Sequence, residues 1–405
     1  MGRVLPPATL VALLAFVLAA AATAAPTPTP GVTSKQILIG STGPLTGEAA
    51  TASNVLRGAD AYFKYINARG GVNGRQVKFM YLDDAYDPVK ASQNAHQLVQ
   101  QDKVFALFAV VGTDGNLAIR DYANTAGVPQ VFSASGASAL GRDPATYPWT
   151  IGYSPTYAGE GQVYAHHILA TNPKKAKIAI LYQADAYGRD LLAGLRKGLG
   201  AKNRKLIVQT VGYESTDADV ESQVDQLKAS GANTFCIFAF GKFAIQAYVY
   251  ADKLGWHPQV YVNNVASSSA VMRLNPQTTA EGSISTAWSE DPMTPKYAHA
   301  RGVKLAASII KTYVPGGSTT DVFLVAGMAE AYSLVDALNA AGRNLTRSGL
   351  MTAVTHMNET TNPFLVPGIV VHTTPTFRFP ISQVQLQRWH KGRWVPFGPL
   401  LDAKT

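Results

Sequence analysis

Cysteine is almost absent from this sequence, which holds one, Cys236, in 405 residues. A single cysteine excludes an internal disulfide framework and any zinc site built on paired cysteines. It stands in the apolar stretch "TFCIFAF" at residues 234–240, which is typical of a strand buried on both faces. We therefore expect Cys236 to be a small core residue rather than a nucleophile.

Charged residues are also sparse, at 15% of the chain. The 35 Lys and Arg exceed the 26 Asp and Glu, but they are dispersed, with only short groups such as "NPKKAK" and "KNRK". A nucleic-acid binder would gather its basic residues on one surface. The pattern therefore predicts no nucleic-acid partner, while 47% hydrophobic residues predict a globular chain with enough core for two lobes.

Enzyme motifs are missing as well. The eight histidines form no HExxH pair, and the chain has neither a G-x-S-x-G elbow nor a phosphate-binding G-x(4)-G-K loop. Ser308 and Lys311 match the S-x-x-K pattern, but without its partner motifs an amphipathic helix explains them better. Asp83 and Asp84 suit a solvated strand end that caps a helix. We expect no catalytic residue, no metal and no cofactor.

The N-terminus has the three parts of a signal peptide over residues 1–24. Arg3 provides a positive charge, "TLVALLAFVLAAAA" provides the apolar region, and "ATA" at 22–24 is a small-residue cleavage site. Residues 25–32, "APTPTPGV", then predict an extended Pro-rich tether. We expect a protein exported to the periplasm, with a mature N-terminus near Ala25 and no lipid anchor, because no cysteine lies near the cleavage point.

Apolar strand patterns alternate with helical spacing in two successive runs. The first run extends from "KQILIG" at residue 35 to "PQVFSAS" at 129–135, and the second from a helical stretch at 157–171 to "QVYVNN" at 259–264. Further helical segments are expected near 295–313, 321–341 and 346–356, and an antiparallel hairpin near the C-terminus. Two β-α runs predict an α/β fold with two mostly parallel sheets flanked by helices.

The loops that follow the strands are the best candidates for a site. Three of them in the first run are built from Gly, Ser and Thr: residues 40–47, 110–116 and 132–138. Ligands of open α/β sheets lie beyond the carboxyl ends of the strands, and helix N-termini there favour anions. We expect these loops to form one wall of a cleft. The second run offers aromatic and polar groups at its own strand ends, which core filling or surface exposure explains almost equally well: Tyr187, Phe240, Lys242, Asn263 and Asn264.

With these stretches in view, the chain resembles the periplasmic solute-binding proteins of ABC importers, in the branched-chain amino acid (leucine/isoleucine/valine) group. The resemblance covers about Ile37 to Phe397 and is carried by "ILIGSTGPLTG", "INARGGVNGRQV" with "DDAYDP", "ANTAGVPQVFSASGAS" and "IAILYQADAYGRD". It implies a type I periplasmic binding fold, in which two Rossmann-like lobes are joined by a three-segment hinge. The implied lobes are residues 33–151 plus 286–365, and residues 152–285 plus 366–400.

The resemblance also implies a function. Members of the family are not enzymes: they close on a small solute and deliver it to a membrane permease, and we expect a monomer. By motif position, small loops hold the carboxylate of the solute, the second lobe adds an aromatic and polar groups, and one aromatic lines the side-chain pocket. The implied ligand-binding residues are Gly112, Thr113, Ser135, Gly136, Ala137, Tyr187, Phe240, Lys242, Asn263 and Phe323.

One departure from the family bears on the ligand. Leucine-binding relatives place an acidic residue for the ammonium group in the loop that corresponds to "VNNVAS", where this chain has Asn263 and Asn264. A branched-chain or other amino acid and an aromatic or short-chain organic acid both remain open. A ligand-sensing module for a membrane receptor is the alternative to transport, since the same fold serves receptors.

Overall fold

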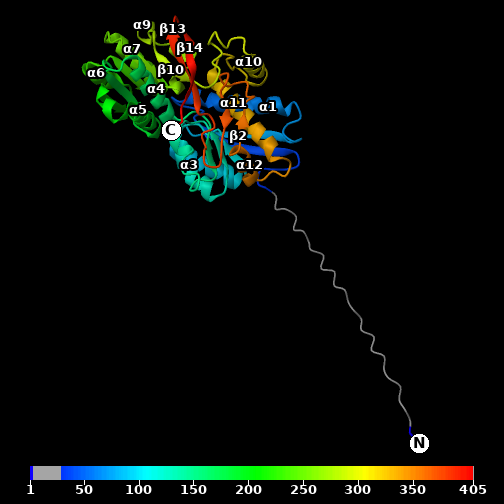
Figure 1. Ribbon diagram of the computed structural model, residues 1–405. Helices are drawn as coiled ribbons and strands as arrows, with labels where there is room; N and C mark the ends of the chain where they lie inside the picture. The colour runs from blue at the N-terminus through cyan, green and yellow to red at the C-terminus, as the bar shows by residue number, and fades with distance from the viewer. Residues whose placement is uncertain (3–28, 405) are drawn as a thin grey trace.

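A computed structural model describes residues 1–2 and 29–404 of the chain (Figure 1). The expected signal peptide from residue 3 onward and the first part of the Pro-rich tether lie outside the described residues. The last four tether residues, 29–32, are attached to the folded protein. The Thr29 hydroxyl donates a hydrogen bond to the Leu345 carbonyl at 3.1 Å, and Val32 forms a β-bridge with Ile37.

The first sheet has five parallel strands in the order β2-β1-β3-β4-β5. Their bounds are β1 Gln36–Gly43, β2 Gln76–Asp83, β3 Ala106–Phe108, β4 Gln130–Ser133 and β5 Thr150–Gly152. The helices between them are α1 Asn54–Asn67, α2 Pro88–His96 and α3 Thr113–Thr125. Because all five strands are parallel, their carboxyl ends meet at one edge of the sheet.

The second sheet has seven strands in the order β14-β13-β10-β9-β8-β6-β7. The parallel strands are β6 Ile178–Gln183, β7 Ile207–Tyr213, β8 Thr234–Phe238, β9 Gln259–Val262 and β10 Ile284–Ala287. The antiparallel hairpin expected at the C-terminus is β13 Gln383–His390 and β14 Arg393–Asp402. The helices of this lobe are α4 Tyr157–Thr171, α5 Ala186–Asn203, α6 Glu221–Ala229 and α7 Lys242–Lys253. Cys236 is buried in the core, as expected.

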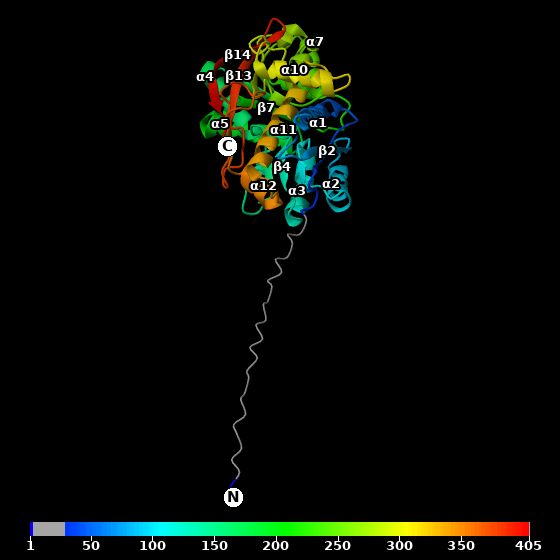
Figure 2. The ribbon, with the colours of Figure 1, turned by 90° about the vertical axis from the view of Figure 1, so that its right-hand side faces the viewer.

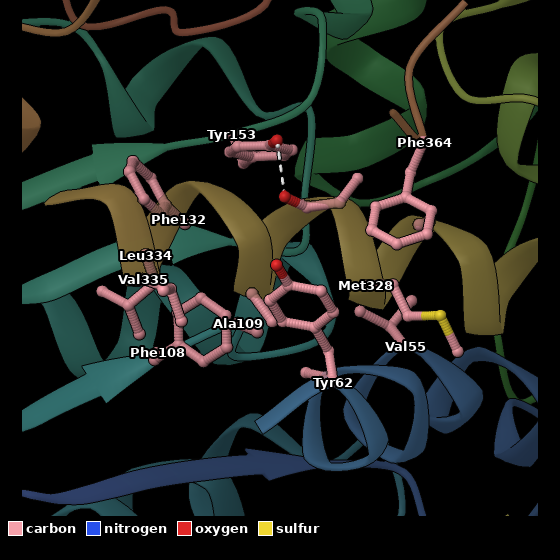
Figure 3. Close-up of a cluster of buried hydrophobic side chains, with 14 of the residues drawn as sticks. Val55, Tyr62, Phe108, Ala109, Phe132, Tyr153, Met328, Leu334, Val335 and Phe364 are labelled. Carbon is pink, nitrogen blue, oxygen red and sulfur yellow. Dashed lines mark hydrogen bonds between the residues drawn. The ribbon is translucent and has the colours of Figure 1, made fainter. Parts of the chain in front are cut away.

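Three later helices return to the first lobe: α10 Arg301–Tyr313, α11 Val322–Ala341 and α12 Arg347–Val354. The apolar helix α11 is long enough to span a membrane, but most of it is buried in the protein. It lies against α1 and the first sheet, where Met328, Leu334 and Val335 pack among the aromatic rings of the core (Figure 3). Gly58 and Gly327 allow the close approach, because a Cβ on either would overlap the backbone of the other helix.

Shorter elements complete the chain. They are η1 Ala50–Ser53, η2 Gln97–Gln101, η3 Ser138–Leu140, η4 Arg204–Leu206, η5 Asn264–Ala266, α8 Ser269–Met272, α9 Gln277–Ala280, β11 Asn358–Glu359 and β12 Val371–His372. The two sheets and their helices form two lobes side by side (Figure 1), and Figure 2 shows the same arrangement turned by 90°.

The chain passes between the lobes three times: after β5, after β10 and before β13. The second and third passages run together, since Glu290 donates its N–H to the Phe364 carbonyl at 3.0 Å and Val366 donates to Trp288 at 2.9 Å. The third passage also meets the first, through the Ile381 N–H and the Tyr153 carbonyl. This connectivity confirms the two-lobed α/β fold with a hinge of three segments.

Some local expectations were wrong. The helix expected over 88–101 changes at Gln97 into a π-helical turn, and Asp87 caps its start by accepting from the N–H groups of Val89 and Lys90. Asp83 and Asp84 therefore cap no helix. Asp83 accepts hydrogen bonds from Leu45, Thr46 and Ala85 instead, because its carboxylate lies under the loop after β1.

Candidate ligand-binding site

A cavity of about 120 Å³ lies between the two lobes. Its wall draws on the strand ends of both sheets, on the N-terminal half of α11 and on the passage after β10. The carboxyl ends of the first-sheet strands deliver Val111, Gly112, Ala134 and Ser135 to it, as the parallel arrangement requires.

One end of the cavity is rich in hydrogen-bond donors. Thr113 is the first residue of α3, and its hydroxyl lies 2.8 Å from that of Ser135, which follows β4. The first N–H groups of a helix have no acceptor within the helix, so this end of α3 favours an anion. Gly112 precedes the helix with φ of 98°, a conformation suited to glycine, and a Cβ there would meet the Tyr86 ring.

Tyr157 brings a third hydroxyl to this end from the second lobe. Its N–H donates to the Gly136 carbonyl at 2.7 Å. Burial raises the pKa of Tyr157 to about 12, while hydrogen bonds from Gly136, Ser135 and Thr113 act to lower it. The phenol therefore stays neutral at physiological pH and adds no negative charge beside a bound anion.

The middle of the cavity is aromatic and apolar. The rings of Phe240, after β8, and Phe323, on α11, face each other edge to face with centroids 6.5 Å apart. Tyr187 packs against Tyr157 at 4.9 Å and donates its hydroxyl hydrogen to the Ala239 carbonyl, so its ring is held in place. Val55 completes a surface suited to the apolar body of a ligand.

Two of the three carboxyl groups on the wall are already bound within the protein. Glu160 accepts hydrogen bonds from the Tyr164 hydroxyl at 2.5 Å, the Asn264 N–H at 2.6 Å and the Thr286 hydroxyl at 3.1 Å. Burial nevertheless raises the pKa of Glu160 to about 7. Asp291 accepts from the N–H groups of Ser269 and Met293. Glu160 thus joins α4 to η5 and β10, and Asp291 joins the segment after β10 to α8.

The third carboxyl group, Glu330 of α11, is different. Its side chain is 1% exposed, and its Oε2 atom is buried without a hydrogen-bond partner among the described residues. Burial raises the pKa of Glu330 well above its usual range. Glu330 therefore reaches the cavity wall as an unsatisfied polar group.

The cavity gathers seven of the ten residues that the resemblance implied. These are Gly112, Thr113, Ser135, Gly136, Tyr187, Phe240 and Phe323. The other three, Ala137, Lys242 and Asn263, lie outside its wall.

Each of the three has a local reason for its position. Ala137 precedes η3, and its N–H donates inward to the Ser135 hydroxyl. Lys242 begins α7 and directs its Nζ atom to Glu48 of the other lobe, at 3.7 Å from Oε1. Asn263 follows β9 and is fully buried, whereas its neighbour Asn264 begins η5 and lines the cavity.

The loop at 40–47 is also absent from the cavity wall. Gly40–Gly43 continue β1, and the Thr46 hydroxyl donates to Asp83 at 2.6 Å. The expectation that this loop forms the wall is wrong for this conformation, because Asp83 holds the loop against the end of β2.

Sequence reasoning missed several lining residues, among them Tyr157, Glu160, Trp288, Asp291 and Glu330. A signal was available for one of them. Phe323, Ala326 and Glu330 are spaced three and four residues apart, so they share one face of α11. An acid on the apolar face that carries an implied pocket residue was itself a sign of the site.

The lobes are in contact across the cleft. Asp190, on α5, accepts from both the N–H and the hydroxyl of Ser138, at 2.9 and 2.8 Å. The pair of Lys242 and Glu48 is a second contact that joins the lobes across the cleft. Among residues 1–2 and 29–404, no group of three or more His, Cys, Asp and Glu side chains is placed to hold a metal ion.

Comparison with known proteins agrees with this architecture. The sequence pattern of the periplasmic binding protein family matches residues 36–393. The chain is 27% identical over 330 residues to an "Amino acid binding protein" of Pseudomonas aeruginosa, which covers 76% of this chain and 79% of that protein. It is 24% identical over 327 residues to the "Leu/Ile/Val-binding protein homolog 2" of Brucella abortus, with 78% and 81% covered.

Solved structures with the same fold bind different solutes. A branched-chain amino acid ABC transporter protein of Thermus thermophilus with bound valine superposes with a TM-score of 0.81 at 19% identity, over 91% of this chain and 97% of that one. A fatty acid ABC transporter substrate-binding protein of Thermomonospora curvata superposes with a TM-score of 0.75 at 21% identity, over 92% of this chain and 94% of that one. At such identities the likeness shows the fold alone. The family match over most of the chain establishes the resemblance drawn from the sequence: this chain belongs to the periplasmic binding protein family, and its relatives include proteins of the leucine/isoleucine/valine-binding type.

Proposed function

We propose that this protein is the extracytoplasmic solute-binding component of an ABC importer, which captures a small carboxylate-bearing solute between its lobes and delivers it to a membrane permease. The observation that carries the proposal is the donor-rich end of the cavity. There Thr113 and Ser135 place two hydroxyl groups 2.8 Å apart at the N-terminus of α3. Hydrogen bonds from such groups to a carboxylate are stronger than those between neutral partners.

The apolar middle of the cavity supports a solute with a hydrophobic body. Phe240 and Phe323 cover that body from opposite lobes, so a ligand would touch both lobes at once and stabilise their closure. The sequence motifs extend the proposal to a periplasmic monomer with a cleaved signal peptide, whose mature N-terminus near Ala25 can be checked by mass spectrometry of the exported form.

A thermal-shift screen with amino acids, aromatic acids and short-chain acids tests the proposal. A ligand at one hundred times its dissociation constant should stabilise the folded protein by roughly 2.7 kcal/mol, which moves a melting curve visibly. Each hit is then compared with its primary amide by calorimetry. Binding of the amide as tightly as the acid would contradict the carboxylate assignment.

A further inference from the structure

Glu330 stands alone among the acids of the cavity. Glu160 accepts three hydrogen bonds and Asp291 accepts two from backbone N–H groups, while the buried Oε2 atom of Glu330 has no hydrogen-bond partner among the described residues. The hydroxyl group of nearby Tyr153 forms hydrogen bonds with the Ala329 carbonyl and with Ser333 instead of with Glu330. Burying a carboxyl oxygen without a hydrogen-bond partner destabilises the folded protein, so its presence on this helix needs an explanation.

The packing of α11 does not explain why a carboxyl group stands at this position. The helix is apolar and deeply buried around this position, and an alanine or leucine would complete its face without a polar group. Glu330 instead shares that face with Phe323 and Ala326, which also line the cavity. Its side chain is therefore directed by the helix toward the space that a ligand would fill.

We propose that Glu330 is the acceptor for a protonated amine of the solute, so that the cavity selects a solute carrying both a carboxylate and a cationic nitrogen. The inference rests on the proposed function and names its substrate class more narrowly. A cation beside Glu330 would supply the missing partner and favour the ionised form of the carboxyl group, which releases its proton and forms a charge-assisted pair with the amine. The acid absent from the loop of Asn263 and Asn264 would thus be replaced from another element of the fold.

The test compares acids that differ only in the amine. The panel consists of amino acids and their desamino counterparts, such as L-leucine with 4-methylpentanoate, L-phenylalanine with 3-phenylpropanoate, and 4-aminobutanoate with butanoate. Dissociation constants are measured by calorimetry for the wild-type protein, for Glu330→Gln and for a matched control, Glu359→Gln. Glu359 is also buried, at 4% exposed, and its Oε2 atom likewise has no partner among the described residues, but it lies outside the cavity wall and its Oε1 atom accepts a hydrogen bond from Ser333.

We expect the amine-bearing member of the bound pair to bind roughly ten- to a hundredfold more tightly in the wild type, as one charge-assisted hydrogen bond provides. Glu330→Gln should remove that preference and leave the affinity for the desamino acid within threefold, while Glu359→Gln keeps the preference. Equal affinity for the two members in the wild type overturns the inference without reference to any variant.

Two further outcomes separate the inference from the function on which it rests. If desamino acids bind and amino acids do not, or if Glu330→Gln weakens both members equally, the assignment of Glu330 is wrong while the carboxylate-binding function stands. If no acid of the panel binds the wild-type protein, the proposed function fails and the inference fails with it.

Discussion

Thr113 and Ser135 belong to different β-α units, 22 residues apart, yet their hydroxyls meet at 2.8 Å. The meeting follows from parallel pairing, because the strands before them, β3 and β4, are neighbours that end at the same edge of the first sheet. Residues this small leave the N-terminus of α3 open to a ligand. At the scale of single residues, the binding chemistry therefore depends on short side chains in a fixed place.

Replacing Thr113 by valine tests this chemistry, since it keeps the shape and removes the hydroxyl. We expect the affinity for the bound carboxylic acid to fall by one to two decades, because a hydrogen bond to a charged group contributes roughly 1.5–3 kcal/mol. Calorimetry measures the change, and Thr312→Val on the exposed face of α10 serves as the control. An affinity within twofold of the wild type would remove Thr113 from the carboxylate site.

At the scale of elements, the contact between α1 and α11 fixes the position of the part of the cavity wall that α11 provides. The two helices approach at Gly58 and Gly327, so that α11 presents Phe323 and Glu330 beside residues of the first sheet. Asp321 fixes the start of α11 by accepting from the Phe323 N–H at 2.8 Å and from the Asn54 side chain at 2.6 Å. The position of Glu330 is thus set by the packing of α11 on α1, a helix that is distant from it in sequence.

Gly327→Ala is expected to separate these helices. Its Cβ would overlap the Val55 carbonyl, and such overpacking costs roughly 1–3 kcal/mol of folding free energy. Chemical denaturation should show this loss, with weaker ligand binding because Phe323 moves. Gly115→Ala is the control, since its Cβ would meet only the Ala91 side chain at 3.3 Å. Equal stability of both variants would show that the contact is not tight.

At the scale of the whole molecule, closure depends on contacts that join the lobes. Asp190 accepts two hydrogen bonds from Ser138, and these bonds cross the cleft. Asp190→Ala should weaken apparent ligand affinity about tenfold, because it destabilises the closed form without touching the cavity. Small-angle scattering should show ligand-induced compaction in the wild type and in the control Asp225→Ala on the exposed surface of α6. Unchanged affinity in Asp190→Ala would argue against a role for this contact.

The pH dependence of stability is another property of the whole protein. Burial raises the pKa values of Glu160, Glu290 and Glu359 to about 7 each, well above the unfolded value of 4.5. Between these values the folded state keeps protons that the unfolded state has lost, so stability falls as pH rises from about 4.5 to 7. Melting temperatures measured across this range should decline.

The same melting experiments should also show a loss of stability at low pH, and they have a control variant. Asp83 and Glu281 have lowered pKa values, because hydrogen bonds favour their charged forms, so their contribution is lost as pH falls below their unfolded values. Stability is therefore expected to be highest near pH 4, below the range in which the buried glutamates act and close to the unfolded pKa values of Asp83 and Glu281. Glu359→Gln should flatten the decline toward pH 7, and an unaltered slope would show that Glu359 does not titrate there.

The sequence by itself determined the two β-α runs, the antiparallel C-terminal hairpin and the positions of Thr113 and Ser135 at one sheet edge. These features follow from periodicity and from parallel pairing, which are local or depend on neighbouring strands. Only the tertiary structure decided which side chain of a loop faces the cavity, Asn264 rather than Asn263, and that Lys242 pairs with Glu48. Apolar spacing on α11 shows which face is buried but not what it is buried against. Glu330 therefore became a candidate site residue only when the fold placed that face beside the cavity. An acid without a partner in that position can bind a group of the ligand.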